Sequence, residues 1–139
     1  MTGNLDSVLL DTSVWIDAFQ GKTPGIVAVV QGLLNDDRIL TCGPVIFEIK
    51  RGLRPPERKK ILPLFNALIR LSVDETVWDA AGDLDASLGK KGITIPPMDV
   101  IIAQVCVHHK VFLFTLDEHF RSVSGLKLFE PLASPSHLK

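Results

Sequence analysis

The chain has 139 residues, of which 46% are hydrophobic and 22% are charged, and its formal net charge at pH 7 is −1. This length suits one domain with a hydrophobic core, and the composition excludes an intrinsically disordered chain. A net charge near zero excludes a strong overall field that would attract nucleic acid by itself. The longest apolar runs fall well short of the roughly 18 residues that a membrane span needs, so we expect no membrane segment.

The N-terminus and the cysteines indicate the compartment. Residues 1–8 contain Asp6 but no Lys or Arg, so they lack the basic region of a secretory signal. Cys42 and Cys106 lie in apolar surroundings without CxxC spacing, which favours buried reduced thiols over a disulfide or a zinc site. We therefore expect a cytoplasmic protein.

Two kinds of segment alternate along the chain. Short aliphatic runs predict buried strands, and longer segments with helical spacing, several of which begin with proline, predict helices. Pro63 lies inside one of these helices and predicts a kink or a break. In chain order, we expect strands at 6–11, 38–43 and 110–116, and helices at 23–37, 43–53, 55–71, 74–92 and 95–110. Strands separated by helices predict an α/β fold with a parallel sheet and helices on both faces.

Four acids stand where such a fold forms sites. Asp11 closes the first strand, Asp117 follows the last, Asp99 lies in the first turn of a helix, and Glu48 lies on the helix after the second strand. Each acid alone could cap a helix, begin a turn or face solvent. Together they would gather at the carboxyl edge of the sheet and repel one another unless a cation neutralised them. Because hard divalent cations prefer oxygen ligands, this pattern predicts a Mg²⁺ or Mn²⁺ site.

A basic run follows Glu48. Residues 50–60 hold six of the 15 basic residues and one acid. A solvated helix face is the simplest explanation of such a run. Beside a metal site, however, its cations could hold phosphates of a nucleic acid or contact a protein partner. The candidate contacts are Lys50, Arg51, Arg54 and Arg58.

Four motifs, in order, carry a resemblance to a known family. They are "VLLDTSVWID" (8–17), "PVIFEIKRGL" (44–53), "ITIPPMDVIIAQVCVHH" (93–109) and "VFLFTLDEHF" (111–120). With these motifs the chain resembles a PIN-domain ribonuclease, and within that group a toxin of the VapC type. The resemblance implies one PIN domain, which we place at 1–133 with a flexible tail at 134–139. It also implies a three-layer α/β/α fold around a central, mostly parallel sheet.

The resemblance further implies an activity and partners. It implies a Mg²⁺- or Mn²⁺-dependent endoribonuclease that hydrolyses RNA phosphodiester bonds as the toxin of a toxin–antitoxin pair. A cognate antitoxin would inhibit it, and the toxin would form a homodimer.

The family's site residues transfer to positions of this chain. The catalytic acids match Asp11, Glu48, Asp99 and Asp117, of which Asp11, Asp99 and Asp117 would bind metal and Glu48 would bind metal or hold the attacking water. Ser13 and Thr115 match hydroxyls that orient the carboxylates, and Thr12 is a further candidate. The chain departs from the family at His119, where an acid often stands.

Two other functions stay open on the residues alone. An acid at the end of a first strand also suits an aspartyl-phosphate enzyme with Asp11 as nucleophile, although no second acid follows two residues later. A non-catalytic RNA-binding or partner-binding module on the same fold is the other alternative, because a fold does not by itself imply activity.

Overall fold

A parallel sheet forms the centre of the computed structural model, which describes residues 6–131. The sheet has four strands in the order β3-β2-β1-β4, and each neighbouring pair is parallel. The central strand aligns Leu9 with Leu40 on one side and with Leu113 on the other. The strands are β1 (Val8–Leu10), β2 (Ile39–Cys42), β3 (Ile69–Leu71) and β4 (Phe112–Phe114). The predicted tail at 134–139 lies outside the described residues.

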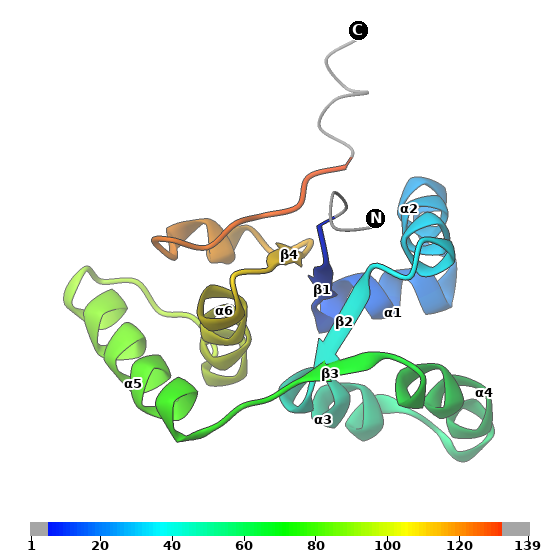
Figure 1. The fold of residues 1–139 in the computed structure, drawn as a ribbon, viewed down its shortest axis with the longest axis horizontal. Helices are drawn as coiled ribbons and strands as arrows, with labels where there is room; N and C mark the ends of the chain where they lie inside the picture. Colours follow the sequence, from blue (N-terminus) through cyan, green and yellow to red (C-terminus); the bar gives the residue numbers. More distant parts are fainter. Residues whose placement is uncertain (1–5, 132–139) are drawn as a thin grey trace, which may run out of the picture.

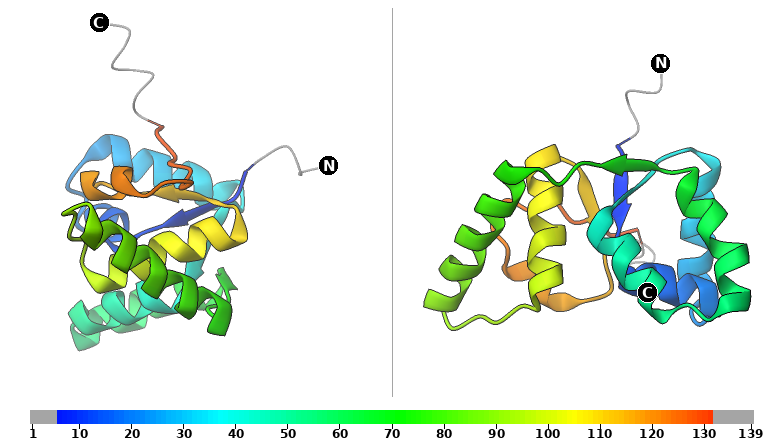
Figure 2. Two further views of the ribbon diagram at one scale, coloured as in Figure 1. Left: turned by 90° about the vertical axis from the view of Figure 1, so that its left-hand side faces the viewer. Right: turned by 90° about the horizontal axis from the view of Figure 1, so that it is seen from below.

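Six α-helices surround this sheet. Figure 1 shows α5 and α6 on one side of it and α1, α2 and α4 on the other, and the views in Figure 2 agree. This arrangement confirms the predicted α/β/α class. No helix within residues 6–131 is long and apolar enough to cross a membrane. The helices are α1 (Thr12–Gln20), α2 (Pro24–Asn35), α3 (Gly43–Gly52), α4 (Pro55–Asn66), α5 (Glu75–Lys90) and α6 (Pro97–His109), and a short 3₁₀ helix, η2 (Glu118–Ser122), follows β4.

The hydrophobic core explains why β1 and α6 are so apolar. All three side chains of β1 are fully buried, because helices cover both faces of this central strand. Five residues of α6 are also buried, since α6 lies between the sheet and α5. Both predicted thiols, Cys42 and Cys106, are buried and free. The core therefore fixes the carboxyl end of β1 and the first turn of α6, where two of the candidate site residues lie.

The prediction for residues 55–71 is wrong in its second part. The helix α4 ends at Asn66, and Ile69–Leu71 form the edge strand β3, which pairs with β2. This strand is hard to recognise because its side chains are mostly exposed, and it is defined by backbone pairing instead. Pro63 does not end α4. Phe65, which is buried two residues later and lies 4.7 Å from the Trp15 ring, packs the last turn against α1.

A buried acid outside the candidate site joins α1 to α2. Asp17 is 6% exposed, and its two carboxylate oxygens accept hydrogen bonds from the Thr23 backbone N–H at 3.1 Å and from the Thr23 hydroxyl at 2.8 Å. Thr23 is the N-cap residue of α2. Asp17 thus fixes the turn between two helices.

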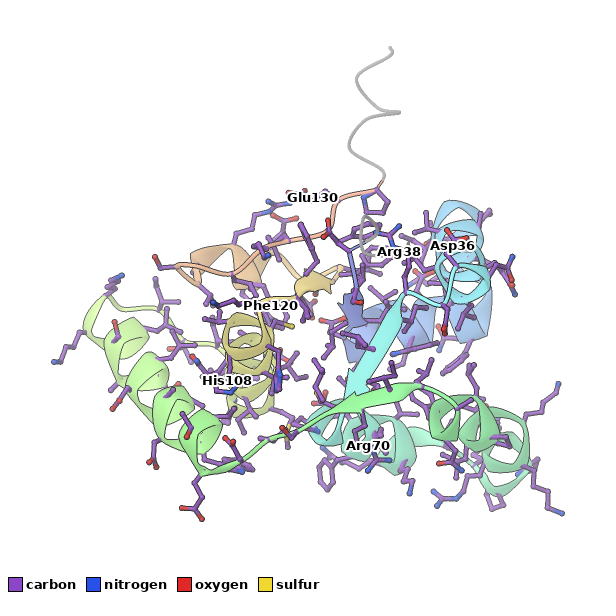
Figure 3. All side chains as sticks on the ribbon, in the orientation of Figure 1. Asp36, Arg38, Arg70, His108, Phe120 and Glu130 are labelled. Carbon is purple, nitrogen blue, oxygen red and sulfur yellow. The ribbon has the colours of Figure 1, made fainter. Side chains whose placement is uncertain are left out.

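We expect Asp17→Ala to lower the free energy of unfolding by about 1–3 kcal/mol, because it removes two hydrogen bonds to a buried carboxylate that join α1 to α2. Urea denaturation measures this change. Asp36→Ala is the control, because Asp36 is an exposed acid at the end of α2 (labelled in Figure 3), and it should change stability by less than about 0.5 kcal/mol. Equal losses in the two variants would contradict the role of Asp17.

Candidate active site

The four candidate acids line one cavity. Its volume is about 460 Å³, and it lies at the carboxyl end of the central strand β1. The acids come from four separate parts of the chain, which only the fold brings together. The residues that line the cavity are Asp11, Thr12, Ser13, Glu48, Arg51, Gly52, Asp99 and Asp117.

Asp11 lies deepest, because it directly follows the buried strand β1 and is itself only 2% exposed. It is also the N-cap residue of α1 and accepts a hydrogen bond from the Val14 backbone N–H at 3.3 Å. Burial raises the pKa of Asp11 from its ordinary value of 3.8 to about 6, against the lowering effect of its hydrogen bonds. Asp11 does cap α1, which was one of the explanations open from the sequence. A cap alone does not require a buried carboxylate, however, so capping is not its whole role.

Two hydroxyls orient Asp11. Ser13 donates to Asp11 Oδ1 at 2.6 Å, and Thr115 donates to Asp11 Oδ2 at 2.5 Å. Each hydroxyl also accepts a backbone N–H from the segment after β4: Ser13 from Leu116 at 3.1 Å, and Thr115 from Asp117 at 3.0 Å. This network connects the carboxyl ends of β1 and β4. It therefore fixes the position of the Asp11 carboxylate relative to the backbone of Asp117.

Glu48 reaches the cavity from α3. This helix begins directly after β2 and is anchored by the buried side chains of Ile46 and Ile49. The Thr12 hydroxyl donates to Glu48 Oε1 at 2.6 Å. Thr12 thus orients Glu48, whereas Ser13 and Thr115 orient Asp11.

Asp99 lines the cavity and is in contact with His119. Asp99 lies in the first turn of α6, and its Oδ2 is 2.9 Å from His119 Nε2. Burial raises the pKa of Asp99, His119 lowers it, and the charges of Glu48 and Asp117 raise it further. Sequence reasoning noted His119 only as a departure from the family pattern. Its position two residues after Asp117 was the signal that could have placed it in the site.

The four basic residues that were candidates for RNA or partner contact lie in different surroundings. Arg51 lines the cavity. Arg54 instead pairs with Glu57, with its Nε 3.5 Å from Glu57 Oε1, and Arg58 donates to the Lys50 carbonyl at 3.3 Å. Of these residues, Arg51 is the one that the fold brings to the acids.

The donor set fits a hard divalent cation. Its carboxylates come from four residues, and a ligand atom from each of Asp99, Asp117 and His119 lies within 4.8 Å of the other two. Burial is the main cause of the raised pKa values of Asp11 and Asp99, and the charges of neighbouring carboxylates raise both further, so positive charge at this site would stabilise the ionised acids. Mg²⁺ or Mn²⁺ would supply that charge and accept oxygen ligands.

We expect the raised pKa of Asp11 to make the metal-free protein more stable at low pH. Between about pH 6 and pH 4, Asp11 is protonated in the folded state and ionised in the unfolded state, so lowering the pH through this range favours folding. The shift from 3.8 to about 6 corresponds to roughly 3 kcal/mol. Denaturation of wild type and Asp11→Asn in EDTA, at pH 7.5 and pH 4.5, measures it: the wild type should gain about 2 kcal/mol of this stability relative to the variant, because pH 4.5 still lies above the ordinary pKa of 3.8. Parallel pH profiles would contradict the prediction.

Comparisons with known proteins agree with this fold and site. The family model "PIN domain" matches residues 8–126. A VapC ribonuclease of Mycobacterium bovis and ribonuclease VapC11 of Mycobacterium tuberculosis are each 31% identical to the chain over 125 residues, which cover 86% of this chain and 92% of the relative.

Solved structures show the same fold. A DNA-bound VapBC from Salmonella typhimurium superposes with a TM-score of 0.76 at 22% identity, covering 90% of this chain and 98% of the other. VapBC2 from Rickettsia felis, bound to a promoter DNA fragment, superposes with a TM-score of 0.73 at 18% identity, covering 88% and 96%. The chain therefore belongs to the PIN domain family and, within it, to the VapC ribonucleases.

Proposed function

We propose that this ribonuclease is a Mg²⁺- or Mn²⁺-dependent endoribonuclease that hydrolyses RNA phosphodiester bonds, and that it acts as the toxin of a toxin–antitoxin pair. The observation that carries the metal-dependent chemistry is the convergence of Asp11, Glu48, Asp99 and Asp117 on one cavity at the carboxyl end of β1. A cytoplasmic location, expected from the sequence, and a homodimer, implied by the family resemblance, complete the proposal.

The positions of the residues in the cavity indicate a separate role for each in the proposed reaction. Asp11, Asp99 and Asp117 would hold the cation, which when bound supplies the charge that activates water and stabilises a phosphodiester leaving group. Thr12 fixes one oxygen of Glu48 at 2.6 Å, and we assign the other oxygen to orienting the attacking water and accepting its proton. Ser13 and Thr115 keep Asp11 in one orientation, because a ligand that rotates freely binds a cation less tightly.

Arg51 supplies the positive charge for the RNA backbone. Its side chain is exposed beside the acids, where it can contact a phosphate next to the scissile bond. Such a contact positions RNA without reading its sequence. We therefore assign RNA contact to Arg51, whereas Lys50, Arg54 and Arg58 would contribute only to the general field.

An antitoxin is the proposed protein partner. One solved structure with this fold is the DNA-bound VapBC from Salmonella typhimurium. Another, from Mycobacterium tuberculosis, is a member of the VapBC family of toxin–antitoxin systems. In this chain a small apolar cavity shares Glu48 and Gly52 with the acidic cavity, so a bound chain could cover both. Its apolar lining comes from Ile16, Phe19, Ile49, Leu53 and Ile61. An antitoxin bound there would exclude RNA from the acids.

The alternatives explain fewer of the observations. Both oxygens of Asp11 accept hydroxyl donors and its side chain is 2% exposed, which suits a fixed ligand better than an aspartyl nucleophile. A non-catalytic module would not need four carboxylates in one cavity, since their mutual repulsion is unfavourable without a cation.

We expect the purified protein to cleave labelled RNA with Mg²⁺ or Mn²⁺ and to lose this activity in EDTA. Asp11→Asn and Asp99→Asn should each lower the cleavage rate at least about 100-fold, because each removes a charged ligand. Asp83→Asn is the matched control, since Asp83 is an exposed acid of α5. Full activity in both site variants would overturn the site, and an acid-labile phosphoryl adduct would favour the phosphotransfer alternative.

We expect Arg51→Ala to weaken RNA binding more than Lys59→Ala, which removes an exposed cation of α4 from the same basic run. Fluorescence anisotropy with the Asp99→Asn variant, from 50 to 200 mM salt, measures binding without cleavage. In Arg51→Ala, the plot of the logarithm of the binding constant against the logarithm of the salt concentration should be less steep by about 0.7, because one phosphate contact to a single strand is lost. Equal effects of the two variants would contradict a specific role for Arg51.

A further inference from the structure

His119 is an unassigned side chain of the candidate site. The family pattern often has an acid at this position, whereas this chain places an imidazole there, with Nε2 2.9 Å from Asp99 Oδ2. The contact could serve only to orient Asp99. The position of the ring relative to both Asp99 and Asp117 indicates a further role.

The backbone at His119 is firmly held. It belongs to η2, in which the next residue, Phe120, is completely buried against the core (labelled in Figure 3). Arg121 donates to Glu118, the residue before His119, at 2.9 Å and to Glu130 at 2.6 Å. These contacts keep the His119 ring beside Asp99, which lines the cavity, and 32% of the His119 side chain is exposed.

The spacing of the donor atoms suits coordination of one ion. Neighbouring ligands of an octahedral cation lie about 3 Å apart and opposite ligands about 4.2 Å apart, because bonds of about 2.1 Å meet at right angles. Asp99 Oδ2 and His119 Nε2 already have the spacing of neighbouring ligands, 2.9 Å. The three donor atoms of Asp99, Asp117 and His119 all lie within 4.8 Å of one another.

We propose that His119 is a nitrogen ligand of the metal in this site, together with Asp99 and Asp117, and that it makes the site prefer Mn²⁺ over Mg²⁺. The proposal rests on the metal-dependent function proposed above and specifies its cation. Imidazole binds transition-metal ions well, whereas Mg²⁺ takes oxygen ligands almost exclusively. A neutral ligand in place of an acid also adds no charge to a cavity that already holds four carboxylates.

Titration calorimetry with Mn²⁺ and Mg²⁺ at pH 7.5 tests the preference. We expect His119→Ala to weaken Mn²⁺ binding at least about 10-fold and Mg²⁺ binding less than about 3-fold. His119→Asp should restore an oxygen ligand and lower the ratio of Mn²⁺ to Mg²⁺ affinity. His108→Ala is the control, because His108 is an exposed histidine at the end of α6 (labelled in Figure 3), and it should change neither affinity.

A spectroscopic measurement tests the bond directly. Pulsed electron paramagnetic resonance of the Mn²⁺-bound protein should show coupling to one imidazole nitrogen in the wild type, and the coupling should be absent in His119→Gln. Denaturation in EDTA checks that each variant is folded.

The outcomes separate this proposal from the proposed function. Equal weakening of both ions by His119→Ala, without nitrogen coupling in the wild type, would overturn the proposal and show that His119 only orients Asp99. In that case Asp11→Asn would still abolish binding, and the carboxylate site would stand. Binding of neither ion by the wild type would overturn the metal site and the role of His119 together.

Discussion

The Asp11 carboxylate at the end of a completely buried strand is the constraint on which the rest of the structure depends. A charged group at 2% exposure is unfavourable unless hydrogen bonds and a counter-charge stabilise it. Here the hydrogen bonds come from Ser13 and Thr115, while a bound cation would supply the counter-charge. The parallel pairing of β1 with β4 is necessary for this arrangement, because it brings Thr115 beside a residue that is 104 positions away in sequence.

The remaining acids are placed by the same architecture. β2 lies on the other side of β1 and leads directly into α3, which carries Glu48. α6 packs against β4 and presents Asp99 in its first turn. Since both helices are anchored by buried apolar residues, the positions of the acids depend on the core, and a substitution that loosens α3 or α6 would also misplace a carboxylate.

The sequence predicted most of this arrangement because the signals were local. The buried strands β1, β2 and β4 are apolar runs, and five helices have clear periodicity or proline starts. Three of the four acids follow a strand or lie in the first turn of a helix, and Glu48 lies within the helix that follows β2. The edge strand β3 was not predicted, because its mostly exposed side chains leave no apolar pattern in the sequence. The separation of Arg51 from Arg54 and Arg58 also could not be read from the sequence, because it depends on where α3 ends and on local partners such as Glu57. The position of His119 two residues after Asp117 indicates the site, but its contact with Asp99 joins η2 to α6, and the sequence alone does not show which acid is its partner.

Two acids of the site, Asp11 and Asp99, differ from two surface acids, Glu57 and Glu130, in the sign of their pKa shifts. Glu57 and Glu130 have arginine partners at the surface, and hydrogen bonds from these partners lower their pKa values. Asp11 is buried and Asp99 is partly buried, and burial raises their pKa values although both accept hydrogen bonds. An arginine beside Asp11 would have lowered its pKa, but it would also have occupied the place of a cation. Hydroxyl partners orient the carboxylate and leave its charge available, which is the condition that a metal-binding acid must meet. The same side-chain type thus serves as a surface ion pair in one place and as a candidate ligand in another, and its partners decide which.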